Sequence, residues 1–159
     1  MPEFSGRLRA TGRVAIIVSR YNEVITGKLL EGARACCSEA GLPETEVDVF
    51  WVPGAFELPV AAMAAAESDR YSCVVALGAV IRGETPHFDF VAGEATRGLG
   101  AVALDLGIPI GFGLLTVDTM EQAQDRAGGS AGNKGHEAAE AALRAADLLT
   151  WIDGDVRRP

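Results

Sequence analysis

Residues 80–90, VIRGETPHFDF, follow an apolar run and bring together Arg82, Glu84, His87 and Asp89. Histidine titrates near neutral pH and is the commonest general acid or base in enzymes, so His87 is a candidate proton carrier. It is one of only two histidines in the chain. A lone histidine is more often structural, and a ring packed at a helix start is the alternative. The local sequence leaves both interpretations open.

The same segment has the features of an anion site. Gly83 lets the backbone approach a ligand closely, and Thr85 followed by Pro86 is typical of an N-cap and a first helical position. The N–H groups at such a helix start attract phosphate. Since a carboxylate repels phosphate, we expect the Glu84 side chain to point away while its N–H faces the anion. A plain N-cap turn is the alternative.

A second motif, VPGAFELP at residues 52–59, spans the change from a strand to a helix. Gly54 suits the tight turn, Phe56 could form a wall of a site, and Glu57 could accept hydrogen bonds from ligand hydroxyls or amines. The alternative is that Phe56 is packed and that Glu57 only stabilises the helix dipole, as acidic first-turn residues commonly do.

Two basic residues flank a glycine-rich break in DRAGGSAGNKG, residues 125–135. Arg126 ends a predicted helix, where a cation is favourable for stability alone, but its guanidinium could also bind phosphate in a bidentate manner. Lys134 stands at a helix start, where the dipole disfavours a cation. That placement indicates contact with a ligand or a partner.

Strands and helices alternate along the chain. Continuous apolar, β-rich runs predict buried strands at residues 13–19, 46–52, 72–81 and 108–117. Helices are predicted from an Asn22 cap to about Ala40, over residues 57–68, from Thr85 to Leu106, from an Asp118–Glu121 capping box to near Gly128, and from Asn133 to about Trp151. This order predicts an α/β fold, a three-layer α/β/α sandwich around a four-stranded parallel sheet. We read residues 1–159 as one domain with an N-terminal arm (1–12) and a C-terminal tail (152–159).

Ligands of open parallel sheets bind beyond the carboxyl ends of the strands. Tyr21 follows the first predicted strand, VPGAFELP the second and RGETPH the third, while Phe112 stands between two glycines in the fourth. We therefore expect these four segments to converge on one edge of the sheet.

Composition narrows the function classes. The 159 residues carry a net charge of −8, which argues against a nucleic-acid binder. The three cysteines form no CxxC, and the chain has only two histidines and no HxxxH, so we expect no metal and no disulfide framework. We expect His136 to be exposed at the surface. No nucleotide fingerprint and no apolar run of membrane-spanning length occurs, so we expect no such cofactor, no membrane association and a cytoplasmic location.

Four motifs together resemble the lumazine synthase family, which catalyses the penultimate step of riboflavin biosynthesis. The resemblance covers Arg13 to Leu149 in order, and rests on VPGAFELP, ALGAVIRGETPHFDFV, GLLTVDTMEQAQDRAG and GNKGHEAA. It implies a flavodoxin-like fold and a transferase that condenses 5-amino-6-(D-ribitylamino)uracil with 3,4-dihydroxy-2-butanone 4-phosphate. The products are 6,7-dimethyl-8-ribityllumazine, phosphate and water, and no cofactor or metal is needed.

The resemblance also implies residue roles around the pyrimidine. Tyr21, where the family usually has Phe or Trp, would stack on the ring, and Phe112 of a neighbouring subunit would close the site. The remaining contacts to the ribityl chain and pyrimidine edge would come from Ala55, Phe56, Glu57, Ala79, Val80 and Ile81.

On the phosphate side, the resemblance implies backbone N–H groups from Glu84 and Thr85, paired with Arg126. His87 would move protons during imine formation and phosphate elimination. Lys134 would lie near the ribityl hydroxyls or the phosphate.

The family assembles as pentamers, as decamers or as icosahedral shells of sixty subunits. GGSAGN, residues 128–133, resembles the shell-type insert, although Ser130 stands where lysine is common, so the resemblance favours a shell, which could enclose riboflavin synthase. The N-terminal segment would pair with a neighbour's sheet. A non-catalytic flavin- or pterin-binding shell protein of the same fold is the alternative; it could lose His87 or Arg126, and both are present.

Overall fold

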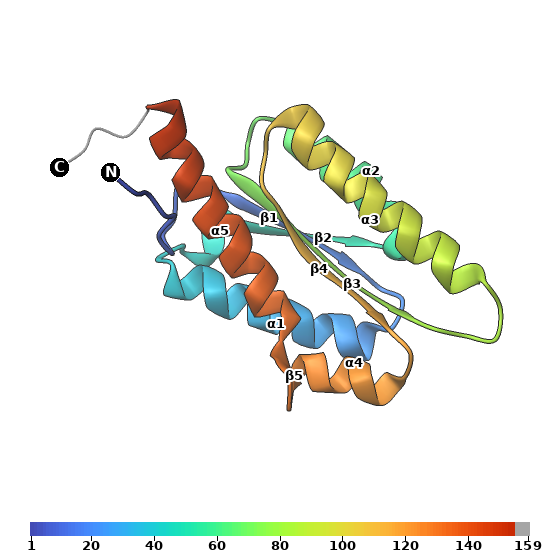
Figure 1. The fold of residues 1–159 in the computed structure, drawn as a ribbon. Coiled ribbons are helices and arrows are strands. Elements are labelled where there is room, and N and C mark those ends of the chain that lie inside the picture. The colour runs from blue at the N-terminus through green and yellow to red at the C-terminus, as the bar shows by residue number, and fades with distance from the viewer. Residues whose placement is uncertain (155–159) are drawn as a thin grey trace.

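The computed structural model describes residues 1–154 and contains one four-stranded parallel sheet in the order β2-β1-β3-β4 (Figure 1). Its strands lie within two residues of the predicted runs. They are β1 (Val14–Ser19), β2 (Val47–Val52), β3 (Cys73–Ile81) and β4 (Ile110–Val117).

Helices cover both faces of this sheet, as Figure 1 shows. Helices α1 (Glu23–Glu39) and α5 (Lys134–Asp153) pack on one face, and α2 (Leu58–Glu67) and α3 (His87–Leu106) on the other. The predicted three-layer α/β/α sandwich is confirmed. The remaining elements are the 3-10 turns η1 (Glu44–Glu46) and η2 (Ala55–Glu57), helix α4 (Met120–Arg126), and a hairpin of β5 (Ala127–Gly129) and β6 (Gly132–Asn133).

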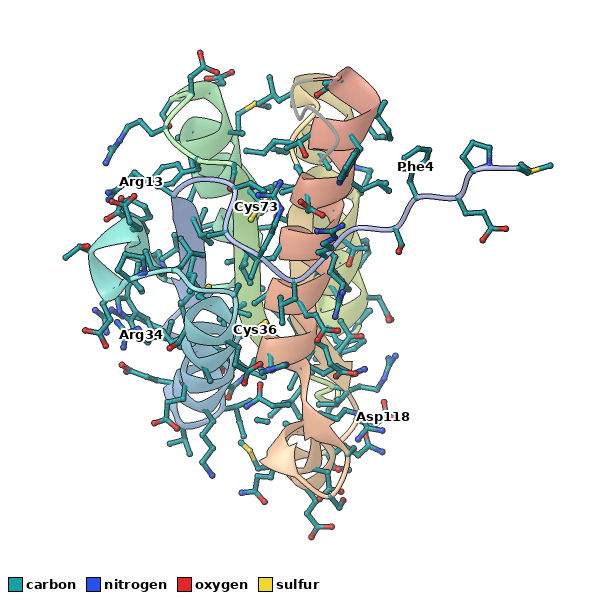
Figure 2. All side chains as sticks on the ribbon, turned by 90° about the vertical axis from the view of Figure 1, so that its left-hand side faces the viewer. Phe4, Arg13, Arg34, Cys36, Cys73 and Asp118 are labelled. Atoms are coloured by element: carbon teal, nitrogen blue, oxygen red, sulfur yellow. The ribbon has the colours of Figure 1, made fainter. Side chains whose placement is uncertain are left out.

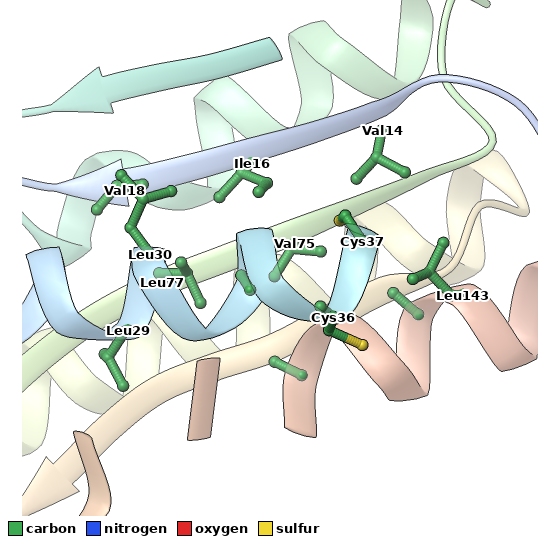
Figure 3. Close-up of a cluster of buried hydrophobic side chains, with 14 of the residues drawn as sticks. Val14, Ile16, Val18, Leu29, Leu30, Cys36, Cys37, Val75, Leu77 and Leu143 are labelled. Carbon is green, nitrogen blue, oxygen red and sulfur yellow. The ribbon is translucent and has the colours of Figure 1, made fainter. Parts of the chain in front are cut away.

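The central strands explain the long apolar runs. All six residues of β1 are buried, because helices cover both of its faces and strands flank both of its edges. Its even-numbered side chains face α1 in one of two core clusters, with Val18 beside Leu30 and Val14 beside Cys37 (Figure 3). Ala15 and Ile17 belong to the second cluster, under α2 and α3.

Helix α3 begins one residue later than predicted. Pro86 is its N-cap rather than its first helical residue, because its ψ of 3° lies outside the helical range. Thr85 is therefore not the N-cap, although its Oγ1 still accepts a long hydrogen bond of 3.4 Å from the His87 N–H.

The cap of α4 is also shifted by one residue. Thr119, not Asp118, is the N-cap, and its Oγ1 accepts from the Gln122 N–H at 3.1 Å. Gln122 Oε1 in turn accepts from the Asp118 N–H at 2.7 Å. The sequence offers both DxxE and TxxQ spacings, and the second one forms.

The N-terminal arm contains no strand and crosses α5, with Phe4 beyond it (Figure 2). The buried Asp147 carboxylate accepts from the Arg7 N–H at 2.7 Å and forms an ion pair with Arg9. The ring of Phe4 lies 5.9 Å from that of Trp151. Pairing of the arm with a neighbour's sheet therefore stays a prediction.

The C-terminal tail predicted at residues 152–159 begins inside α5, which continues to Asp153. Residues 155–159 lie outside the described part of the chain. Among the helices of residues 1–154, none combines the length and the apolar character needed to cross a membrane.

Helices α1 and α5 meet at very close range. A Cβ added to Gly135 would lie 1.9 Å from the carbonyl oxygen of Leu29, so only glycine fits there without separating the helices. Asn133 fixes the contact, because its Oδ1 accepts from the N–H groups of Gly135 and His136 while its Nδ2 donates to the Lys28 carbonyl at 3.0 Å. The predicted start of this helix at Asn133 is confirmed.

Gly135→Ala should destabilise the fold. The added methyl group overlaps backbone atoms that cannot rotate away, and overpacking of this kind costs about 1–3 kcal/mol. We expect a lower midpoint in thermal or urea unfolding.

Gly27→Ala is the matched control, because Gly27 lies in α1 and a Cβ there meets nothing within 4 Å. It should leave stability unchanged or raise it by up to about 1 kcal/mol, the helix propensity gained over glycine. Equal stability of the Gly135→Ala and Gly27→Ala variants would contradict the close packing.

Candidate active site

A cavity of about 800 Å³ opens at the carboxyl edge of β1, β2 and β3. Its volume lies within the range of small-molecule sites, and its walls are mostly apolar. The lining residues are Tyr21, Gly54, Ala55, Phe56, Glu57, Ala79, Val80, Ile81, Gly83, Thr85, His87, Phe88, Phe90 and Val91.

Three of the four predicted segments converge here, and the fourth does not. Phe112 is the third residue of β4 and pairs with Ala76, so the glycine-flanked phenylalanine lies toward the amino end of its strand. Its side chain is 49% exposed and does not line the cavity. The expectation that GFG reaches the carboxyl edge is wrong, because β4 continues for five more residues, to Val117.

Hydrogen bonds hold the loops after β1 and β2 together. The Arg20 and Tyr21 N–H groups donate to the Val52 and Pro53 carbonyls at 2.8 and 3.0 Å. These bonds extend the β1–β2 ladder into the loops, and they place the largely exposed Tyr21 ring at the cavity rim.

Asn22 ties the same loop to β3. Its residue is the N-cap of α1, but its side chain does not bond to the helix; Nδ2 donates to the Ala79 carbonyl at 3.0 Å. The predicted N-cap position is confirmed, but without a side-chain hydrogen bond to the helix. With a φ of 62°, the residue occupies the left-handed region, which asparagine tolerates better than most residues do.

Strand β3 presents backbone to the cavity. Its pairing with β1 ends at Leu77, while its pairing with β4 continues to Ile81. The Arg82 N–H donates to Val117 on β4, and the Ala79 carbonyl faces the opposite side, toward Asn22. Because backbone groups alternate along a strand, the N–H and C=O of Ile81 face the cavity side.

Phe56 and Glu57 lie on the wall formed by η2. Phe56 is 59% exposed and lines the cavity, so it is not packed in the core. Glu57 Oε1 accepts from the Gly54 N–H at 2.9 Å and fixes the turn, while Oε2 has no partner within residues 1–154. Glu57 thus serves its local backbone and still offers an oxygen to a ligand.

His87 is the first residue of α3, and its exposed side chain lines the cavity beside Thr85. Glu84 is exposed and does not line the cavity, so the orientation of its carboxylate and its N–H toward an anion stays a prediction. The helix start and the proton carrier predicted from sequence thus lie against the same space.

Arg82 is engaged in holding this helix start. It donates from Nε to Asp118 at 3.1 Å, pairs with Asp89 at 3.3 Å, and places its guanidinium 4.4 Å from the Phe88 ring centre. The hydrogen bond with Asp118 raises the pKa of Arg82 above its ordinary value. The cluster joins the end of β3 to α3 and to the β4–α4 loop.

Arg126 and Lys134 do not line the cavity. Arg126 donates to the Gln122 carbonyl of its own helix at 3.1 Å, and Lys134 pairs with Glu137 at 3.3 Å. Within one chain, Arg126 therefore makes the kind of local contact that was its alternative interpretation, and Lys134 also has a local partner. They lie at the two ends of the β5–β6 hairpin.

Sequence reasoning missed several lining residues, above all Phe90 and Val91. They lie one helical turn after His87, and the spacing of three and four residues from a candidate catalytic side chain was the available signal. Phe90 is 74% exposed, so with Tyr21 and Phe56 it gives the cavity three aromatic walls. Gly54, Gly83 and Phe88 were quoted in the motifs but not assigned as site residues.

A family model described as 6,7-dimethyl-8-ribityllumazine synthase matches residues 11–150. The matched range includes the four strands of the sheet and every residue that lines the cavity. It also includes the five α-helices, except for the last three residues of α5.

Asn22→Ala should lower stability by about 1–2 kcal/mol, because it removes the donor to Ala79 and places an unsuited residue in the left-handed region. Asn22→Gly loses the same donor but adopts that backbone freely. We expect the order wild type, glycine variant, alanine variant in thermal unfolding. An alanine variant as stable as the glycine variant would contradict this account of the rim.

Proposed function

The chain belongs to the 6,7-dimethyl-8-ribityllumazine synthase family, which are transferases of riboflavin biosynthesis, and from this premise we propose its reaction. It condenses 5-amino-6-(D-ribitylamino)uracil with 3,4-dihydroxy-2-butanone 4-phosphate to give 6,7-dimethyl-8-ribityllumazine, phosphate and water. The observation that carries the proposal is the family match, joined to a cavity in which aromatic walls, a free strand edge, a helix start and a histidine meet.

The pyrimidine substrate fits the side of the cavity bounded by β3 and Tyr21. The Tyr21 ring can stack on the heterocycle, and the Ile81 backbone can donate to and accept from its polar edge. The ribityl hydroxyls would then reach the η2 wall, where the Ala55 and Phe56 backbone and the free Glu57 oxygen can bind them.

The phosphate substrate fits the start of α3. The N–H groups of Glu84 and Thr85 precede a 20-residue helix, and the positive end of its dipole attracts an anion. Gly83 leaves the approach open, because a Cβ there would meet nothing within 4 Å. This placement sets the ketone of the second substrate beside His87.

His87 would carry protons in the condensation. The substrate amine attacks the ketone, and loss of water gives an imine; removal of a carbon-bound proton then allows phosphate to leave. A neutral imidazole can accept that proton and return it during ring closure, which ends with loss of a second water. Holding the two substrates together supplies most of the rate, and His87 adds a smaller factor.

Phe112, Arg126 and Lys134 would reach the site from a second copy of the chain. None of them lines the cavity of its own chain, and the three aromatic walls are exposed there. Arg126 of a neighbour can bind the departing phosphate, and Phe112 can cover the pyrimidine. We accordingly propose a pentamer with sites between subunits, further assembled into an icosahedral shell through the β5–β6 insert.

Mixing both substrates with the protein should produce lumazine absorbance faster than the spontaneous reaction. His87→Ala should lower kcat by up to about 100-fold, the low end for one acid–base group, with little change in KM for the pyrimidine. His136→Ala, which alters the other histidine, should leave kcat unchanged. A wild-type rate equal to the background would sink the proposed reaction and favour a binding or shell protein.

Arg126→Ala should weaken the phosphate substrate far more than the pyrimidine. Subunits carrying Arg126→Ala should also regain activity when they are co-assembled with His87→Ala subunits. In a random mixture, about a quarter of the interfaces would pair an intact His87 with an intact Arg126. Glu57→Ala mixed with His87→Ala should not complement, since both residues line the same cavity. No recovery in the first mixture would place Arg126 in its own chain's site.

A further inference from the structure

Three potential metal ligands cluster between α1 and α5, outside the lining of the cavity. Cys36 and Glu39 lie near the end of α1, and His136 lies in the first turn of α5. One ligand atom from each lies within 4.8 Å of the others, and His136 Nε2 is 3.0 Å from Glu39 Oε2.

We propose that Cys36, Glu39 and His136 form a binding site for a thiophilic divalent cation of the Zn²⁺ class, linking α1 to α5. Thiolate, imidazole and carboxylate are the zinc ligands of proteins, and bonds of about 2.0–2.3 Å place tetrahedral ligand atoms about 3.5 Å apart. The His136–Glu39 pair already has nearly that spacing. Side-chain movements on the order of 1 Å would bring the remaining pairs to it.

The backbone around the site is well fixed. Cys36 is fully buried, and Figure 3 shows its sulfur directed toward α5, whereas Cys37 points to the sheet. His136 is held through its N–H, which donates to Asn133 at 3.1 Å, next to the tight contact of Gly135 with Leu29. An ion would therefore meet ligands whose positions are largely set in advance.

Local charges favour a cation. No basic residue lies in the last turn of α1, where the helix dipole attracts positive charge. Glu140 follows His136 by one turn and forms an ion pair with Arg144 at 3.6 Å. Glu140 or a water could complete four ligands.

A metal binds cysteine as the thiolate, so binding at Cys36 would release the thiol proton. Glu39 and His136 are partly exposed, which gives an ion a path to the sulfur. If no metal binds, Glu39 and His136 are simply paired at the surface beside an unreactive buried thiol. The experiment below distinguishes this pair from a metal site.

Co²⁺ titration of the chelator-treated, full-length protein tests the site directly. We expect one ion per chain, with the near-ultraviolet thiolate-to-cobalt band and the strong visible bands of a tetrahedral complex. Cys36→Ser should abolish the thiolate band. His136→Gln should weaken binding by more than the roughly 10–100-fold that loss of an outer hydrogen-bond partner costs.

Cys37→Ser and His87→Gln are the matched controls, an adjacent buried cysteine and the only other histidine, and both should bind as wild type does. Zn²⁺ should raise the Tm of wild type and of Cys37→Ser but not of His136→Gln. Because His136 is partly exposed, we expect the His136→Gln variant to fold. Metal removal should leave lumazine formation unchanged, so this site and the proposed reaction can fail independently. Absence of the thiolate band in wild type, or its survival in Cys36→Ser, would overturn the proposal.

Discussion

The candidate site depends on one feature of the sheet: β3 continues for four residues beyond its last pair with β1. Beyond Leu77 no β1 residue pairs with β3, yet β4 supports β3 as far as Ile81. The chain after β1 turns away there, and the Asn22 side chain binds the Ala79 carbonyl. The end of β3 therefore lines the cavity without a partner strand on its β1 side, and its backbone there can bind water or a ligand.

The cavity follows from that feature through the connectivity of a parallel sheet. Every strand ends at the same edge, so the loops after β1, β2 and β3 must meet around the end of β3. This is why Tyr21, Phe56 and His87 could be placed together from sequence, with no knowledge of their distances. Phe112 was misplaced for a different reason. Its strand was predicted correctly, but GFG lies near the start of that strand and not at its carboxyl end.

What the sequence could not supply was the choice between equivalent local patterns and the contacts between distant segments. Asp118–Glu121 and Thr119–Gln122 have the same capping spacing, and only side-chain geometry selects the second. From the sequence, Phe90 could equally be a core residue or a cavity residue. Only the packing of α3 on the sheet decides between them. The Cys36–His136 cluster joins residues a hundred positions apart and depends on Gly135, whose role is visible only once α5 lies on α1.

Exposed aromatic rings around the cavity would link subunit association to the proposed reaction. Tyr21, Phe56 and Phe90 surround an open cavity, and apolar groups of that size gain free energy when a neighbour covers them. Within one chain, by contrast, the Arg126 guanidinium donates to the Gln122 carbonyl and Lys134 pairs with Glu137. If a second copy brings Phe112 and Arg126 over the cavity, the same association buries the aromatic walls and adds the missing cation. Assembly and completion of the proposed site would then be one event, because a single chain leaves the three aromatic walls of the cavity exposed and Arg126 outside its lining.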